Sequence, residues 1–417
     1  MKNIIITLLI TIVFFRIMHP IATIIVKADD SVELVFWNVE SREPRNSISQ
    51  EDINIFNTLN PTINIKAVYI DSDTYKMKVK VALAGNQMPD IIYSWPGELF
   101  NTMIEAGALT DLTEKIESKS YFKSKFLPAS FEQTTYKGRI YGIPINFNSV
   151  VIWYNKEIFK DNQIDIPKNW DELLLIVDQL NTSGLTPIAI GSKEGWPILY
   201  WFSYLSQRIG GKELFQQAIT GKEDFTHPVF IETADKLKTL KDRGGFTKDF
   251  LEKDSEAAEE RFTTGKAAMY MQGDWSLLSL LKDLEFSEKI GFFPFPEIKD
   301  GQGSPDIVYG GINGILAISQ NTDLDTAFKF IEYNFIFEKN NNSTIKKDQP
   351  LPIMGIKGEN INPLVNKYTD FINSSKGFFG YYDQQLGFNR TEKLLNAIQI
   401  ILKNNKVDIE YVLSKVE

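Results

Sequence analysis

The sequence predicts an α/β protein of two domains, on the evidence of its length and the order of its segments. The chain has 417 residues, which is more than one hydrophobic core usually fills, so two domains are expected. Near its start, strand-like and helix-like segments alternate in the order β-α-β-α-β. This order is typical of a mostly parallel sheet with helices on its faces. The apolar content of 43% and the charged content of 24% are ordinary for a soluble globular protein.

The first domain begins with this alternation. Each predicted strand is a short apolar or alternating run, and each predicted helix carries apolar residues at helical spacing. In chain order the segments are a strand at 32–37, a helix at 48–61, a strand at 63–70, a helix that ends in a glycine-containing turn, and a strand at 90–95.

The rest of the chain repeats these element types. The helix at 167–184 is the clearest, because Asn169 suits its N-cap, Glu172 stands three residues later and Gly184 suits its end. The other predicted elements are two short strands around Asn146 and Asn148, strands at 186–191 and 290–296, a helix at 196–211 that stops at two glycines, a helix, a turn at Gly265 and a strand within 256–273, a strand around a glycine-rich bend at 307–320, a helix at 325–337 and an amphipathic segment at 392–405.

The N-terminus has the pattern of a secretory signal peptide. A basic Lys2 precedes an apolar run, and "VKA" at 26–28 fits a small-residue cleavage site. We therefore expect residues 1–28 to be removed and the mature chain to be periplasmic or at the cell surface. The alternative is an uncleaved membrane anchor, because Arg16 and His19 interrupt the pattern.

The composition excludes several kinds of site. The chain has no cysteine and two histidines, so a thiolate nucleophile and a cysteine or histidine cluster for zinc are excluded. A serine–histidine–aspartate triad would have to use His227, which stands before a proline and reads as a loop residue. The net charge of -9 gives no sign of a nucleic-acid partner. We expect no metal and no cofactor.

Polar and aromatic residues gather just beyond the predicted strands, where open α/β sheets bind their ligands. These residues are rich in indole, carboxylate and amide groups and poor in nucleophiles. An indole can stack on the apolar face of a sugar, while carboxylates and amides bind the hydroxyl groups. The residues are Asn38, Glu40, Arg42, Trp95, Asn146, Asn148, Asp274, Trp275, Gly310, Gly311 and Asn313.

Each of these residues also has a purely structural interpretation. Asp274 can cap the following helix while Trp275 packs into the core. Asp274 can also cap the helix and bind a ligand at the same time. Trp196 and Trp201 are five residues apart on a predicted helix. They therefore face different directions, so one can meet a ligand while the other lies in the core. Glu40 and Arg42 can form an exposed ion pair without a role.

Six segments, taken in order, resemble the sugar-binding extracellular solute-binding proteins of ATP-binding-cassette importers, a maltose-binding-protein-like family. The resemblance covers nearly all of the mature chain. The segments are "GRIYGIPINFNSVVIWYNKEIF", "PKNWDELL", "FTTGKAAMYMQGDW", "GGINGILAISQNT", "PLPIMGIKG" and "YYDQQLGFNRTEKLLNAIQIIL".

The resemblance implies two α/β lobes around a ligand cleft, joined by a hinge. The chain would cross near Asn146–Asn148, near Tyr309 and near Phe337–Lys339. The implied lobes are residues 29–146 with 309–337, and residues 147–308 with 338–417. Closure would bury the ligand between the lobes, so each lobe must supply contacts.

By matching position, the resemblance also implies ligand contacts. The N-terminal lobe would supply Trp95 and the loop from Asn38 to Arg42, and the remaining contacts would come from the C-terminal lobe or the hinge. The latter are Trp196, Asp274, Trp275, Tyr382, Asp383 and Gln384.

The implied function is a non-catalytic, monomeric receptor that hands an oligosaccharide to a membrane permease. A secreted glycoside hydrolase is the alternative from another class, with paired carboxylates such as Glu40 and Asp274 as acid and base. A receptor for a peptide, polyol or polyamine is a third. One departure from many relatives is the absence of a lipobox cysteine, so no acylated anchor is expected.

Overall fold

The computed structural model describes residues 31–39, 45–124, 126, 128–337 and 362–416. The predicted signal peptide, Glu40 and Arg42 lie outside the described residues. Across the described ranges, every helix is too short or too polar to span a membrane.

The predicted β-α-β-α-β order is confirmed. Strand β1 lies between β2 and β3 and is parallel to both. The polar turns between these elements bring their apolar faces onto one core. The elements are β1 (Val32–Asn38), α2 (Arg45–Leu59), β2 (Ile63–Tyr69), α3 (Ser72–Ala84) and β3 (Ile91–Ser94). They are followed by α4 (Glu98–Glu105), α5 (Thr113–Glu117), α6 (Ser120–Lys123), η1 (Pro128–Thr134), β4 (Thr135–Tyr136) and β5 (Arg139–Ile140).

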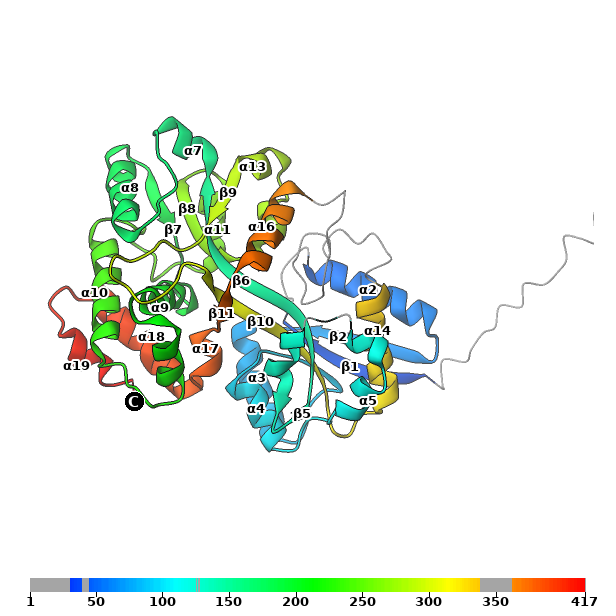
Figure 1. The fold of residues 1–417 in the computed structure, drawn as a ribbon. Coiled ribbons are helices and arrows are strands. Elements are labelled where there is room, and N and C mark those ends of the chain that lie inside the picture. The colour runs from blue at the N-terminus through cyan, green and yellow to red at the C-terminus, as the bar shows by residue number, and fades with distance from the viewer. Residues whose placement is uncertain (1–30, 40–44, 125, 127, 338–361, 417) are drawn as a thin grey trace, which may run out of the picture.

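Two long strands join the two halves of the molecule, as Figure 1 shows. They are β6 (Ile143–Asn155) and β10 (Ile307–Ile318). The N-terminal part of β6 pairs with β10, and its C-terminal part pairs with β8 and β9. The expectation of two short strands around Asn146 and Asn148 was wrong. The chain crosses between the halves in one unbroken strand, so no turn is needed there.

The sheet therefore mixes parallel and antiparallel pairs along the order β2-β1-β3-β10-β6-β8-β7. The outer pairs β1–β2, β1–β3 and β7–β8 are parallel, as predicted. The crossing strands are antiparallel to β3, to β8 and to each other, because β6 leads out of the first half and β10 leads back into it.

The second half is rich in helices. Its strands are β7 (Thr186–Ala189), β8 (Ala267–Gly273), β9 (Ile290–Phe293) and β11 (Gly377–Phe379). Its helices are α7 (Lys156–Asp161), α8 (Trp170–Thr182), α9 (Trp196–Ile219), α10 (Pro228–Asp242), α11 (Ser255–Thr263), η2 (Asp274–Ser276), α12 (Leu277–Leu280), α13 (Leu284–Lys289), α16 (Pro363–Ser374), α17 (Tyr382–Gln385), α18 (Phe388–Lys403) and α19 (Ile409–Leu413). Helix α14 (Leu324–Phe337) returns to the first half.

The sequence predicted the start of one helix correctly and the end of another incorrectly. Helix α8 begins as predicted, because Asn169 Oδ1 accepts the Glu172 N–H at 3.0 Å and the Glu172 carboxylate accepts from the Asn169 amide at 2.7 Å. Helix α9 was expected to stop at its two glycines. Gly211 does leave helical geometry, with φ of 82°, but the chain resumes a helix and continues to Ile219.

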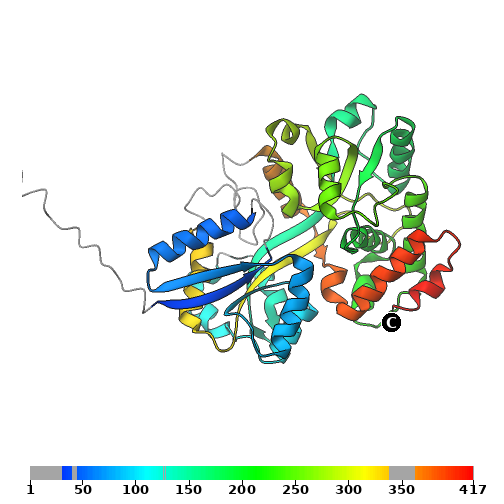
Figure 2. The ribbon, with the colours of Figure 1, turned by 180° about the vertical axis from the view of Figure 1, so that it is seen from behind.

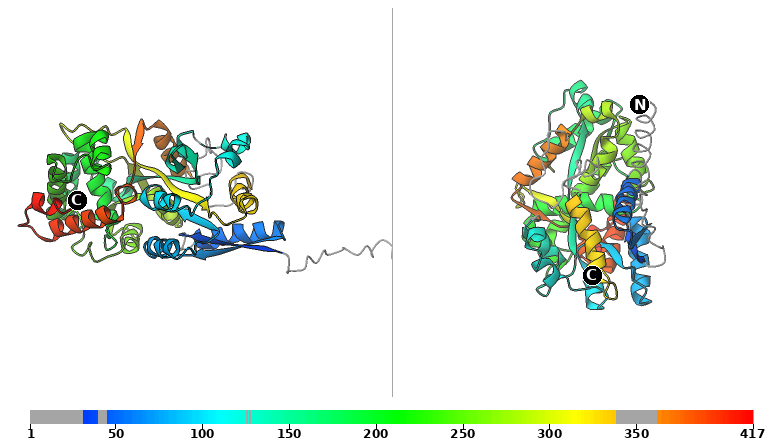
Figure 3. Two further views of the ribbon diagram at one scale, coloured as in Figure 1. Left: turned by 90° about the horizontal axis from the view of Figure 1, so that it is seen from below. Right: turned by 90° about the vertical axis from the view of Figure 1, so that its right-hand side faces the viewer.

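Separate hydrophobic cores define two lobes. The N-lobe core holds residues from the stretches 34–143 and 312–331, and the main C-lobe core holds residues from 150–309 and 379–416. A smaller core covers the other face of the C-lobe sheet around Trp153 and Tyr368. Figures 2 and 3 show the same two bodies from behind, from below and from the side, with α18 and α19 in red on the C-lobe.

Candidate functional site

A chain of hydrogen bonds crosses the hinge and contains four of the predicted residues. Gln384 Nε2 donates to Asn313 Oδ1 at 2.6 Å, and Asn313 Nδ2 donates to Asn148 Oδ1 at 3.0 Å. Asn148 Nδ2 then donates to Asp274 Oδ1 at 2.9 Å. We call these four side chains the hinge relay. It links α17, β10, β6 and η2, and so ties elements of both lobes together.

Backbone geometry places the relay residues. The pairing of β10 with β6 is irregular around Asn313, and this lets the Asn313 side chain bond to Asn148 and Gln384. A Cβ on Gly310 would lie 2.4 Å from the carbonyl oxygen of Asn148. A glycine therefore permits the two crossing strands to approach closely at this point.

Asp274 lies at the buried end of the relay. Its side chain is fully buried, and Oδ1 also accepts the Ser149 N–H at 3.2 Å. The helical turn that follows has no side-chain cap from Asp274, so the capping interpretation was wrong. The carboxylate instead accepts hydrogen bonds from Asn148 and Ser149 on β6 in a region without solvent.

Next to the relay, the C-lobe presents a row of aromatic rings. The ring centroids of Trp196 and Tyr200 are 5.4 Å apart, those of Tyr200 and Trp275 are 6.1 Å apart, and those of Trp275 and Tyr381 are 6.3 Å apart. We call these four residues the aromatic wall. Both tryptophans remain half-buried. Trp201, five residues along α9, is buried, whereas the spacing predicted only that the two indoles face different directions.

Asp383 stands beside this wall. Burial raises the pKa of Tyr200 and Tyr309 well above the ordinary value, and the nearby Asp383 carboxylate raises both pKa values further. The two phenols therefore stay protonated and remain hydrogen-bond donors at neutral pH. Asp383 Oδ1 is buried and has no hydrogen-bond partner among the described residues. An acceptor in this position suits a polar ligand that brings its own donors.

Trp95 is the aromatic residue that the N-lobe contributes. It follows β3, and its ring centroid lies 5.8 Å from that of Tyr75 and 5.3 Å from that of Tyr93. The ammonium of Lys76 on α3 lies 5.3 Å from the Trp95 centroid and 3.6 Å from Asp383 Oδ2. Trp95 and Asp383, which belong to different lobes, are therefore connected through one lysine.

Other predicted residues pack or form hydrogen bonds within the protein itself. Tyr382 is fully buried, and its ring centroid lies 4.3 Å from that of Phe215 within the C-lobe core. Tyr381, also buried, is the residue of this pair that contacts Trp275 in the aromatic wall, and the ligand contact expected of Tyr382 stays a prediction. Asn38 is buried at the end of β1 and donates to Ser49 at 3.3 Å. The backbones of Asn146 and Gly311 pair with Gly314 and Asn148 in the β6–β10 ladder.

Sequence reasoning missed four residues of this region. Tyr200 stands four residues after Trp196, so helical spacing places both on one face and could have revealed it. Tyr381 stood in the same short motif as Tyr382, and the choice between the two needed the tertiary structure. Tyr309 and Lys76 carry no local signal, because their partners come from distant parts of the chain.

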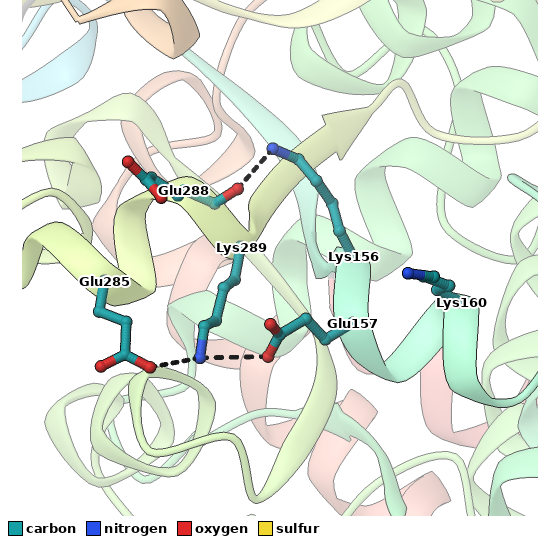
Figure 4. A pocket seen from close by; sticks show the side chains of 6 residues that line it. All are labelled: Lys156, Glu157, Lys160, Glu285, Glu288 and Lys289. Carbon is teal, nitrogen blue, oxygen red and sulfur yellow. Dashed lines mark hydrogen bonds and ion pairs between the residues drawn. The ribbon is translucent and has the colours of Figure 1, made fainter.

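A hollow of about 280 Å³ lies elsewhere on the C-lobe, between α7 and α13. Three lysines and three glutamates line it, and Figure 4 shows Lys289 between Glu157 and Glu285, at 3.2 and 2.7 Å. The lining has no aromatic ring for a sugar face, and three of its six charged residues form ion pairs with one another. The described residues also contain no group of three or more side chains that could hold a metal ion.

The position of Trp275 depends on Gly273, which gives a first prediction. A Cβ on Gly273 would lie 2.2 Å from the Trp275 ring, while the Gly273 backbone, at φ −76° and ψ 166°, accepts any residue. We expect Gly273→Ala to displace the indole and to lower the free energy of unfolding by about 1–3 kcal/mol. Thermal unfolding and near-ultraviolet circular dichroism measure the two effects.

A double variant distinguishes this clash from a general effect on β8. In a Trp275→Ala background the three ring atoms nearest to the added methyl group are gone, so Gly273→Ala should cost less there. An equal loss of stability in both backgrounds would contradict the proposed contact.

Known proteins with the same architecture and related sequences identify the family. The "Multiple sugar-binding protein" of Streptococcus mutans is 25% identical over 356 residues, which cover 81% of this chain and 79% of that protein. A structure from work on xylan utilization by Caldanaerobius polysaccharolyticus is 27% identical with a TM-score of 0.85, covering 92% of this chain and 99% of that one. A chitin oligosaccharide binding protein, 22% identical with a TM-score of 0.83, covers 92% and 97% and shares the fold. The model of the bacterial extracellular solute-binding protein family matches residues 41–334, and the chain belongs to that family.

Proposed function

We propose that this protein is the extracytoplasmic receptor of an ATP-binding-cassette sugar importer and that it captures an oligosaccharide between its lobes. The observation that carries the proposal is the aromatic wall beside Asp383. The half-buried indoles of Trp196 and Trp275 offer flat apolar surface for sugar faces, and the adjacent Asp383 carboxylate offers an acceptor for hydroxyl groups. The named ligand of the Streptococcus mutans relative is also a sugar.

In this proposal the predicted site residues divide into two roles. Trp95, Trp196, Trp275 and Asp383 contact the ligand, with Tyr200 and Tyr381 completing the wall. The hinge relay positions these residues, because Asp274 is adjacent to Trp275 and Gln384 is adjacent to Asp383. Asn38 ends the first strand, Glu40 and Arg42 follow it in the sequence, and we keep all three as candidates for the N-lobe side of the site.

The proposal also covers the surroundings of the protein. Residues 1–28 act as a signal peptide, residues 29–146 with 309–337 form the N-lobe, and residues 147–308 with 338–417 form the C-lobe. The mature chain works as a monomer outside the cytoplasmic membrane and delivers its ligand to permease subunits. We infer no catalytic step, since the family consists of solute-binding proteins and the wall is built for stacking.

The test is a calorimetric and thermal-shift screen of residues 29–417 against mono-, di- and oligosaccharides, with a polyol and a peptide mixture beside them. A ligand of the folded state at a hundredfold excess over its Kd stabilises the protein by about 2.7 kcal/mol. We expect a shift with one class of oligosaccharide. Binding of peptides alone, or release of reducing ends from a glycan by the pure protein, would refute the proposal.

A substitution locates the binding surface. Trp196→Ala removes one indole of the wall, and we expect the Kd for the identified sugar to rise about tenfold through lost stacking. Tyr411→Ala is the matched control, because it removes an aromatic ring that is 62% exposed on α19. If both variants bind like the parent protein, the wall is not the ligand surface.

A further inference from the structure

Lys76 holds an unusual position for a lysine on a surface helix. Its ammonium lies over the Trp95 ring and 3.6 Å from Asp383 Oδ2. Trp95 belongs to the N-lobe and Asp383 to the C-lobe, so the lysine bridges the lobes. The side chains of Lys76 and Asp383 are only 33% and 15% exposed, which makes this pair less solvated than an ordinary surface ion pair.

The surrounding contacts join the same two parts of the molecule. The Glu98 carboxylate at the start of α4 accepts the Phe388 N–H at 2.5 Å, and the Lys80 ammonium lies 3.3 Å from the Phe388 ring centroid. A Cβ on Gly97 would lie 1.9 Å from the carbonyl oxygen of Gln384. Helices α3 and α4 therefore pack directly on α17 and the start of α18, and Lys76 is the residue of this contact that reaches two proposed ligand groups.

We propose that Lys76 is an internal competitor of the ligand, which holds the lobes together when no sugar is bound. The inference rests on the proposed function. The ammonium makes a cation–π contact with the Trp95 ring and an ion pair with the Asp383 carboxylate. A sugar that stacks on Trp95 and donates hydroxyls to Asp383 displaces the ammonium into solvent. The affinity for a neutral sugar is then lower than it would be without Lys76, because binding of the sugar breaks the contacts that Lys76 makes.

This role has two consequences that a simple ligand contact would not have. Removing the ammonium raises the affinity for a neutral sugar, by about two- to fivefold for a partly exposed ion pair. Salt screens the lysine–aspartate attraction, while a neutral sugar has no charge to screen. The affinity of the parent protein should therefore increase between low and high salt, and the affinity of the Lys76 variant should stay constant.

The test compares Lys76→Met with two matched variants by calorimetry. Lys78→Met removes the same charge from the same helix, but the Lys78 ammonium lies 4.5 Å from the ring of Trp37 in its own lobe. It should leave affinity and salt dependence at parent values. Lys76→Arg keeps the cation and should behave like the parent protein. Weaker or unchanged binding by Lys76→Met would overturn the proposal, because Lys76 would then assist the ligand or be indifferent to it.

A ligand-free measurement separates this inference from the proposed function. The chain has no cysteine, so Glu117→Cys on α5 and Leu175→Cys on α8, both exposed, give one dye site on each lobe. Energy transfer should show a longer or more widely distributed distance between the two dyes in Lys76→Met than in the parent protein and in Lys78→Met. If no sugar binds at all, the proposed function fails while this readout still decides the lysine bridge. If the distances in all three proteins agree, the bridge does not hold the lobes.

Discussion

Raising the pH to about 11 is expected to unfold this protein. Seven tyrosines of the described residues are buried and have pKa values above the ordinary value, in each case chiefly because burial disfavours the phenolate. The pKa of Tyr204, for example, is raised to about 12. These residues keep their protons in the folded state at a pH where the unfolded chain, with tyrosine pKa values near 10, has lost them.

The sign follows from proton linkage. The folded pKa values are raised, so the contribution of these tyrosines is fully present below pH 10 and is lost as pH rises toward the folded pKa values. At pH 11 each unfolded tyrosine gains about 1.4 kcal/mol from ionisation, or roughly 10 kcal/mol for the seven. This is comparable with the whole stability of a typical protein.

Far-ultraviolet circular dichroism and tyrosinate absorbance, followed during an alkaline titration, measure the effect. The buried tyrosines should ionise together with the loss of secondary structure. Tyr200→Phe removes one buried acid and should move the midpoint upward by roughly 0.1–0.2 pH units, whereas Tyr411→Phe, at an exposed position, should not move it. A gradual ionisation of all tyrosines well before unfolding would show that burial does not protect them.

Replacing Asp274 with alanine is expected to lower the free energy of unfolding by about 3 kcal/mol and the melting temperature by roughly 5 °C. The variant leaves Asn148 Nδ2 and the Ser149 N–H buried without their acceptor. It also ends the hinge relay, so the sugar affinity should fall further than the stability alone explains. Differential scanning calorimetry and the binding assay measure the two effects.

Two variants serve as controls for Asp274→Ala. Asp274→Asn keeps one side-chain oxygen for both donors and should lose less stability than the alanine variant. Asp235→Ala removes an exposed carboxylate from α10 and should change stability by less than about 0.5 kcal/mol. Equal stability of Asp274→Ala and the parent protein would mean that the relay contributes nothing to the hinge.

The sequence predicted the order of the elements because the relevant signals are local. Apolar periodicity and the Asn169 cap located α8, and the short apolar run before Gly273 located β8. The positions of Asp274 and Trp275 at a strand end followed from the same pattern, and the spacing of Trp196 and Trp201 predicted that the two indoles face different directions.

Features that are set by contacts between distant parts of the chain could not be predicted from the sequence. The unbroken course of β6 is set by pairing with β10 on one side and with β8 and β9 on the other. The bond between Asn313 and Asn148 joins residues 165 positions apart, and no spacing rule connects them. For the same reason, nothing in the motif around residue 381 distinguished Tyr381, which contacts Trp275 in the aromatic wall, from Tyr382, which packs on Phe215.

The two crossing strands also determine when the protein can fold during synthesis. The N-lobe core needs β10 and α14, which contribute residues up to Ile331. A ribosome has therefore made most of the chain before the first lobe is complete, although that lobe contains the N-terminus. Until then β3 has an open edge where β10 will pair, and such an unpaired edge can associate with other incomplete chains. The connectivity that unites the lobes thus delays completion of the first of them until most of the chain has been made.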